Sequence, residues 1–204
     1  RVFSRNLIWT NTADFQKRYG NHRIAGVIGM EAIQNQDNYF GASVNNFFRT
    51  DPLFRNIDNS VTEDIKNIGA SGITTEWALL SYFAQANYSF GNKYVLGATI
   101  RRDGSSRFGS ENRWGVFPAI SGAWIISNEK FFQPLDFFST FKLRASWGKL
   151  GNQEIGNYPY SSLIGVGQYV YSFGGNVVTG AQLQQMGNNK IKWESSTQYD
   201  FGID

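Results

Sequence analysis

Few side chains in this sequence could carry out chemistry, and their spacing gives them few partners. His22 is the single histidine and the chain has no cysteine, which excludes thiol catalysis and a cysteine-based zinc site. His22 stands beside Arg23 at a predicted turn, where a solvated imidazole is a more ordinary role than that of a base. Without a second histidine, a transition-metal site is not expected. The sequence therefore predicts no catalytic residue and no metal ligand among these side chains.

Loop acids and loop glycines are the other groups that could bind a small ion. Four acids could offer oxygen ligands to calcium, but they lack the spacing of a ligand motif, and solvated loop acids are commoner. These acids are Asp51, Asp58, Glu63 and Asp64. Two glycine pairs neither follow a strand nor open a helix, as a phosphate-binding loop would. They are Gly165 with Gly167, and Gly174 with Gly175. We expect no cofactor, and the sequence alone names no substrate-binding residue.

The elements that position any functional residue are strands, because apolar side chains recur at every second position. Every even-numbered residue from Ala78 to Phe90 is apolar, and the pattern resumes from Tyr94 to Ile100 after the dipeptide Gly91-Asn92. Period two is typical of a strand. Arms of about ten residues exceed the usual five or six of a soluble strand and match a strand that crosses a bilayer at a tilt of about 45°. We therefore predict one long membrane-spanning hairpin over 78–103.

Seven strands are predicted in total, with no helix longer than a turn or two. They cover residues 1–12, 21–33, 77–90, 93–103, 115–127, 139–149 and 192–204. In the clear cases all charges fall on one side of the strand, as expected if the other side meets lipid, where Arg or Lys near the midplane costs about 2–4 kcal/mol. The residues predicted to face lipid are Leu80, Ala84, Leu96, Leu143 and Phe201. Those predicted to face the lumen are Gln85, Lys142, Arg144, Glu194 and Asp200, with the two cations near the two acids.

The composition excludes other classes of protein. No apolar run approaches the 18 residues of a transmembrane helix, and the mean hydropathy of −0.36 is that of a polar chain. A barrel remains compatible with this average, because only every second residue of its strands meets lipid. The net charge of +3, without any basic run, gives no reason to expect a nucleic-acid partner.

The connections differ strongly in length between the two ends of the predicted sheet. Up-and-down topology places the long loops 34–76 and 150–191, and the loop 104–114, at one end and the Gly91-Asn92 turn at the other. This asymmetry is typical of outer-membrane barrels, whose long loops are extracellular. A tryptophan belt is expected near the long-loop end, made of Trp77, Trp114, Trp147 and Trp193. An aromatic girdle is expected at the other end, made of Tyr88, Phe90, Tyr94, Phe131, Phe132, Phe137 and Phe138.

A run of motifs covers about 105 residues of the second half. Physically, Asp103-Gly104 has turn chemistry, Pro118 suits the start of a strand, and a compact loop is expected between them, with polar groups from Ser105, Ser106, Arg107 and Asn112. In order, the motifs are Asn92–Tyr94, Arg101–Gly109, Asn112–Pro118, Ser127–Phe132, Leu143–Gly148, Gly151–Tyr158 and Lys192–Glu194. This series resembles the C-terminal barrel region of SusC/RagA-type TonB-dependent transporters of Bacteroidetes outer membranes. Residues 29–31 and 39–42 match more loosely.

The resemblance implies an all-β fold, an antiparallel up-and-down transmembrane β-barrel of about 22 strands. Residues 1–204 would supply about seven of them within one barrel domain, as a fragment, with the plug domain and the remaining strands outside the chain. The implied function is TonB-dependent import of an oligosaccharide or a peptide across the bacterial outer membrane, with no enzymatic activity. The implied partners are outer-membrane lipid, the TonB complex and a SusD-like surface lipoprotein over the extracellular loops.

Three other readings of the alternating strands stay open at this point. A secreted soluble β-sandwich that binds a ligand also has alternating strands, although sandwich strands are shorter. A passive porin-like barrel shares the same strand physics and differs in lacking a plug. An outer-membrane enzyme would need clustered nucleophilic and acidic groups, and the single His22 at the turn end argues against it.

Overall fold

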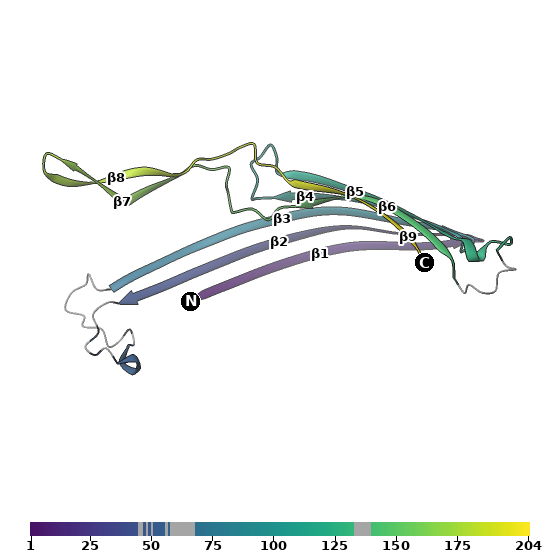
Figure 1. Ribbon diagram of the computed structural model, residues 1–204, viewed down its shortest axis with the longest axis horizontal. Helices are drawn as coiled ribbons and strands as arrows, with labels where there is room; N and C mark the ends of the chain where they lie inside the picture. The colour runs from purple at the N-terminus through teal and green to yellow at the C-terminus, as the bar shows by residue number, and fades with distance from the viewer. Residues whose placement is uncertain (45–46, 48, 50, 56, 58–67, 133–139) are drawn as a thin grey trace. The chain divides into compact units, whose positions relative to one another are not determined.

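The computed structural model of the protein consists mainly of antiparallel β-strands (Figure 1), as the sequence predicts. It describes residues 1–44, 47, 49, 51–55, 57, 68–132 and 140–204. Seven strands form one sheet in the order β1-β2-β3-β4-β5-β6-β9, and β7 and β8 form a separate pair. None of the helices in the described segments is long and apolar enough to cross a membrane.

The strands and short helices have the following bounds. The large sheet contains β1 (Val2–Tyr19), β2 (His22–Val44), β3 (Ile68–Phe90), β4 (Tyr94–Ser105), β5 (Trp114–Ile125), β6 (Lys142–Asn152) and β9 (Glu194–Ile203). The small sheet contains β7 (Leu163–Phe173) and β8 (Asn176–Gln185), and single 3₁₀ turns occur at η1 (Pro52–Phe54) and η4 (Ile126–Asn128). The chain divides into two compact units, unit 1 (Arg1–Leu7 and Gln34–Trp77) and unit 2 (Ile8–Ile33 and Ala78–Asp204). All side-chain contacts described below lie within one unit.

Tight turns join the strands at one end of the sheet, which we call the turn end. Gly91 and Asn92 have φ angles of +59° and +56°, the left-handed pair that a type I′ hairpin turn requires. Gly20, with φ of +54°, begins the two-residue connection between β1 and β2, and the Gly91 N–H donates to the Asn21 carbonyl at 2.9 Å. The opposite edge, where residues 106–113 join β4 to β5, is called the loop end.

The strand register gives the sheet one apolar face and one polar face. Leu96 lies opposite Tyr88 on β3 and Gly122 on β5, and Ala145 on β6 lies opposite Gly122 and Phe201. Because side chains alternate along each strand, the five residues predicted for lipid share this face, and the five predicted for the lumen share the other. We call the face with Leu96 the apolar face and the face with Asp200 the polar face. The predicted separation of the two sets is confirmed.

Little of the molecule is buried, since the sheet is a single layer. Among the described residues, the buried hydrophobic side chains are Phe108, Phe117 and Ile126. By contrast, apolar-face residues such as Leu96 and Phe201 are 56% and 78% exposed. The sheet therefore leaves most of its apolar surface open, and packing within the chain concentrates near the loop end.

The strands extend further than predicted, and the added part of β2 begins with five successive polar residues, from Gln34 to Asn38. β1 continues through residues 13–19, and β2 and β3 run to Val44 and from Ile68, so that both ends of the expected loop 34–76 are strand. In unit 1, Gln36 donates to Glu76 at 2.6 Å and Thr74 donates to Asn38 at 2.7 Å. Polar residues that pair in this way across strands show no apolar side chain at every second position. The alternation of apolar residues therefore did not identify these parts of β2 and β3 as strand.

The expected loop 150–191 contains the β7–β8 hairpin. Gly174 and Gly175 form its turn with φ angles of +55° and +82°, and Tyr171 pairs with Val178 across the two strands. A Gly-Gly pair between segments rich in β-branched and aromatic residues is typical of a hairpin turn. The β7–β8 hairpin could have been predicted from the sequence by this feature.

Three motif residues lie inside strands where a turn or a strand start was expected. β4 continues through Asp103 and Gly104 to Ser105, so the Asp-Gly pair forms no turn. Pro118 lies within β5 opposite Ile100, yet the pairing of β5 with β6 begins only at Ala119. Pro118 thus lies at the limit of that ladder, where a missing N–H costs least.

Candidate functional site

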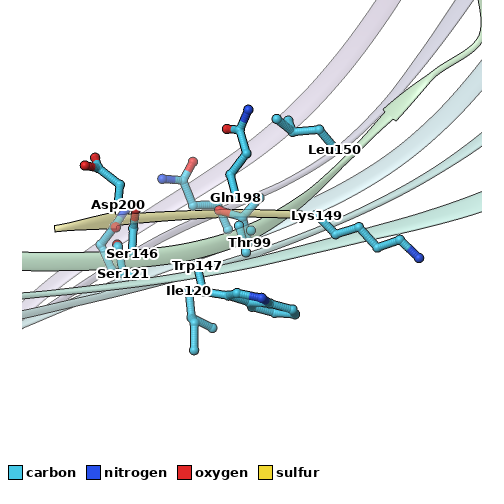
Figure 2. A pocket seen from close by; sticks show the side chains of 14 residues that line it. Thr99, Ile120, Ser121, Ser146, Trp147, Lys149, Leu150, Gln198 and Asp200 are labelled. Carbon is cyan, nitrogen blue, oxygen red and sulfur yellow. The ribbon is translucent and has the colours of Figure 1, made fainter. Parts of the chain in front are cut away.

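The middle of the polar face is a shallow hollow lined by hydroxyl and amide groups. Its volume is about 310 Å³, and Figure 2 shows Asp200, Gln198 and Ser146 on the side of the sheet opposite Trp147 and Ile120. Small residues form its floor, and a Cβ on Gly97 would approach the Ser121 Oγ to 2.6 Å. Such a surface offers donors and acceptors but little charge, and it suits a neutral polar solute.

Charged residues on the polar face gather toward the turn end of β6 and β9. Arg144 lies 3.3 Å from Asp200 and 3.4 Å from Asp204, and Lys142 lies 2.6 Å from Asp204. The predicted proximity of Arg144 and Asp200 is confirmed. The predicted proximity to Glu194 is wrong, because the register places Glu194 opposite Asn152, about 34 Å along the strand from Lys142.

Arg101 joins three strands of the polar face. Its guanidinium donates to the Asp103 carboxylate at 2.8 Å, to the Ser81 hydroxyl at 2.8 Å and to the Glu31 carboxylate at 3.3 Å. The Thr10 hydroxyl donates to the same Glu31 at 3.3 Å and extends the network to β1. Ser81 is fully buried and Asp103 is nearly so, whereas the Arg101 and Glu31 side chains are 37% and 25% exposed. The network links β1 to β4 laterally on this face, and its part around Ser81 and Asp103 is shielded from water.

The loop end contains an aromatic cluster that holds four segments of the chain together, and we call it the rim cluster. The Trp193 ring stacks on Phe108 at 5.1 Å and meets Phe117 edge-on at 5.3 Å between centroids, while its indole N–H donates to the Arg113 carbonyl at 3.0 Å. The Phe117 ring occupies the space in which Gly151 would carry a Cβ, 2.0 Å away. The rim cluster therefore depends on residues from the 106–113 loop, β5 and β6, and on Trp193 immediately before β9.

Polar contacts around the rim cluster agree with the compact loop predicted from the sequence. Arg107 donates to the Gln153 carbonyl at 3.2 Å and pairs with Glu154 at 3.0 Å. Asn112 donates to the Asn189 carbonyl at 3.0 Å. The hydroxyls of Ser105 and Ser106 accept hydrogen bonds from the backbone N–H groups of residues 107 and 78 at 3.2 and 2.9 Å. All four predicted loop residues thus act in holding the rim.

Glu129 organises the turn end in a similar way. Its carboxylate accepts hydrogen bonds from the Lys93 ammonium at 2.7 Å, the Tyr94 hydroxyl at 2.7 Å and the Trp124 indole at 3.2 Å. The Lys93 ammonium is the main cause that holds the pKa of Glu129 below its usual value. Glu129 thereby connects the Gly91-Asn92 turn to the segment that follows β5.

The aromatic residues are arranged partly as predicted. At the turn end, centroids 6.4–6.5 Å apart form the row Phe90, Tyr94, Trp124 and Phe131, which supports the predicted girdle; Phe137 and Phe138 lie outside the described residues. The tryptophan belt is wrong for Trp147, which lies at the middle of β6 opposite Ile120 and Tyr199. Trp193 contacts the polar face through Phe117. Trp114 does lie on the apolar face at the loop end, opposite Gly104.

The residues singled out for possible chemistry have structural contacts where they are described. His22 hydrogen-bonds through Nδ1 to the Tyr88 hydroxyl at 2.8 Å and packs 4.8 Å from the Phe90 ring. Asp51 accepts a hydrogen bond from the Leu53 N–H at 3.1 Å and caps η1. Asp58, Glu63 and Asp64 lie outside the described residues. Within the described part, no three histidine or acidic residues gather as metal ligands would.

Comparison with known proteins identifies the family of this chain, and with it the surroundings of its two faces. A family model described as "TonB dependent receptor-like, beta-barrel" matches residues 2–204. The chain belongs to this family. The TonB-dependent receptor β-barrel resemblance expected from the motifs is thereby confirmed, and the sheet is part of a transmembrane barrel. Since barrel strands alternate between lipid and lumen, the apolar face is the lipid side and the polar face the lumenal side.

Individual relatives of this TonB-dependent receptor β-barrel agree with the family. TonB-dependent receptor P3 of Formosa agariphila is 31% identical over 201 residues, covering 98% of this chain and 19% of that protein. TonB-dependent receptor SusC of Bacteroides thetaiotaomicron is 38% identical over 144 residues, covering 69% and 14%. The solved RagAB peptide transporter matches with a TM-score of 0.83 and 28% identity, covering 99% of this chain and 22% of that one. The chain therefore spans about a fifth of the length of P3 and of the solved chain.

Removing the Trp193 ring is expected to loosen the rim without unfolding the sheet. Trp193→Ala should destabilise the rim locally by about 3 kcal/mol, the low end for tryptophan truncation because the ring is only half-buried. Limited proteolysis of the full-length protein in detergent, with cleavage sites mapped by mass spectrometry, should show faster cutting within 104–114 and 150–160. The Trp193→Phe variant should be cleaved more slowly than Trp193→Ala, and the variant Trp147→Ala, on the lipid side, should be cleaved at the rate of the parent. Equal cleavage of all four proteins would refute the role of the rim cluster.

Glu129 is expected to make stability depend on pH at the acidic side. Because folding lowers the pKa of Glu129, its contribution is complete above the ordinary value of 4.5 and disappears as the pH falls through the lower folded-state value. Glu129→Gln should therefore lower the thermal midpoint of the full-length protein at pH 7, and the difference from the parent should vanish toward pH 3. Glu111→Gln, at an exposed loop residue, is the matched control. A difference that stays constant from pH 7 to 3 contradicts the assignment.

Proposed function

We propose that this chain forms part of the wall and the extracellular rim of an active nutrient importer of the bacterial outer membrane. The loop end faces outward and the turn end faces the periplasm, in keeping with the usual asymmetry of such barrels. Within the whole protein, residues 1–204 belong to one barrel domain, and the plug and the remaining strands come from other parts of the longer chain. Transport is energised through the TonB complex. The single observation that carries this proposal is the family match over residues 2–204.

The transported solute is an oligosaccharide or a peptide. Hydroxyl and amide side chains line part of the hollow of the polar face, and these groups hydrogen-bond equally well to sugar hydroxyls and to peptide groups. One solved neighbour is named a peptide transporter, and the names of the curated relatives state no class of solute. The wall itself carries out no chemistry on the solute, so the protein acts as a transporter and not as an enzyme.

The partner at the loop end is a SusD-like surface lipoprotein that covers the extracellular loops. The β7–β8 hairpin supports this, because a two-stranded hairpin is only marginally stable alone in water. Its apolar side chains are open, with Val170, Phe173 and Val177 exposed by 64%, 71% and 73%. An exposed apolar hairpin in an extracellular loop is better explained by a protein partner than by contact with a polar solute.

Uptake by intact cells tests the transport proposal. Deleting the gene of the full-length protein should abolish uptake of one labelled class, either oligosaccharides or peptides, and a protonophore should abolish it in the parent strain as well. Re-introducing the gene is the control and should restore uptake. Uptake that is lost on deletion but persists with the protonophore would indicate a passive porin. A protein that leaves the membrane without detergent would indicate a soluble binding module.

Polar substitutions on the hairpin test the lipoprotein contact. The triple variant Val170→Thr, Phe173→Thr and Val177→Thr keeps residues that favour strands but removes the apolar surface. Co-purification of the lipoprotein encoded beside the full-length gene should fall by about fivefold or more, as expected for loss of interface anchors. Thr179→Ser, on the same hairpin, is the control and should leave the yield unchanged. Unchanged co-purification by the triple variant would refute contact at this hairpin.

A further inference from the structure

Across Ala78–Phe90 and strands β4, β5, β6 and β9, two cations stand on the lipid-facing side of the sheet, and both lie toward the loop end. Arg102 lies opposite Tyr82 and Val116, and Lys149 lies opposite Thr197, which places both on the apolar face. Across Ala78–Phe90 and strands β4, β5, β6 and β9, this face carries no aspartate or glutamate. Neither cation forms an ion pair with any described residue. The lipid side thus has local positive charge without a protein counter-charge.

Arg102 is held in place by aromatic rings. Its guanidinium carbon lies 4.5 Å from the centre of the Trp114 ring, and Trp114 stacks on Tyr82 at 6.2 Å. Gly104 makes this possible, because a Cβ at that position would lie 2.7 Å from the Trp114 ring. A guanidinium stacked on a ring keeps its edge N–H groups available for hydrogen bonds. Those groups match the fork geometry of phosphate oxygens.

An apolar groove of about 490 Å³ lies on the same face, nearer the turn end than the cations. Gly122 and Ala145 form its floor, and the larger side chains around it are Leu96, Ile120, Trp147, Tyr199 and Phe201. Figure 2 shows Trp147 and Ile120 on the side away from Asp200, with Lys149 also directed away from Asp200. The groove therefore opens toward lipid and not toward the lumen.

From the turn end toward the loop end, the groove comes first and the two cations follow, which is the order of the acyl chain and the headgroup in a lipid of that leaflet. Lys149 follows Trp147 by two residues, about 7 Å toward the loop end, and Arg102 follows Ala98, the partner of Ile120, by four residues, about 13 Å. A chain lying in the groove would bring its headgroup to the level of the two cations. Because Lys and Arg on a lipid face cost free energy unless they reach polar groups, a bound phosphate would offset that cost.

We propose that Arg102, Lys149 and the groove over Gly122 and Ala145 form a specific site for a phosphate-bearing lipid of the leaflet at the loop end. One acyl chain occupies the groove and the phosphate contacts the two cations. This site is separate from the lumenal path of the transported solute, so its occupancy and solute uptake are measured independently.

Native mass spectrometry of the delipidated full-length protein in detergent tests the site. The probes are hexa-acyl diphosphoryl lipid A and the same lipid without phosphates. The parent protein should retain the phosphorylated lipid with an apparent affinity higher by about fivefold or more, as expected for two cations near a phosphate. Equal retention of both probes would indicate annular lipid only and would overturn the proposal.

Two kinds of variant separate the headgroup contact from the groove. Arg102→Gln with Lys149→Gln should remove the preference for the phosphorylated probe, whereas Ala145→Leu, which fills the groove, should weaken retention of both probes. Lys190→Gln with Lys192→Gln, at exposed residues outside the strands, is the matched control and should behave as the parent.

Folding is checked by heat-modifiable migration in gels, and the conservative pair Arg102→Lys with Lys149→Arg should keep the preference. If the variant with both glutamines does not fold, the proposal is still tested by the conservative double variant and by the comparison of the two probes on the parent protein. A folded Gln pair with an unchanged preference would overturn the proposal.

Discussion

The antiparallel ladder from β3 through β4, β5 and β6 to β9 is the interaction on which the other features of unit 2 depend. A barrel strand has no water to satisfy its backbone groups within the membrane, so each one must pair with its neighbours along its whole length. Once the pairing is fixed, a shift by one residue would turn every side chain to the opposite face. The lipid side, the lumenal hollow and the salt bridge between Arg144 and Asp200 all follow from this one register.

The parts of the fold that the sequence predicted are those in which one face of a strand meets lipid. β4, β5, β6 and β9 were located within a few residues because apolar side chains recur at every second position over most of their length. The ends of β2 and β3 in unit 1 have no such contrast, since residues such as Gln36 and Glu76 bond to each other across strands. The β7–β8 hairpin was missed for a related reason, because its exposed faces carry apolar residues on both sides and only Gly174 and Gly175 mark its turn.

Apart from the proximity of Arg144 and Asp200, which followed from opposite charges on strands expected to be adjacent, the contacts of the candidate site were predictable only where chain neighbours make them. The 106–113 loop forms its own hydrogen bonds and was expected to be compact. Trp193, in contrast, donates to the carbonyl of Arg113, 80 residues away, and no local pattern links the two. The position of Glu194 was wrong for the same reason, since the connection before β9 leaves its register unspecified until the whole ladder is known. Trp147 shows a further limit: residue type alone does not tell how deep along a strand a tryptophan lies.

Where a glycine lies beneath an aromatic ring in this protein, the glycine tolerates substitution less than the ring does. Trp114 lies in the space above Gly104, and Phe117 in the space above Gly151. Each ring can be replaced by a smaller side chain and leave only a void, whereas each glycine can gain no carbon without displacing the ring. In the divergence of such barrels, the aromatic partner must therefore shrink before the glycine can change, so that the order of two substitutions, and not only their identity, decides which sequences can be reached.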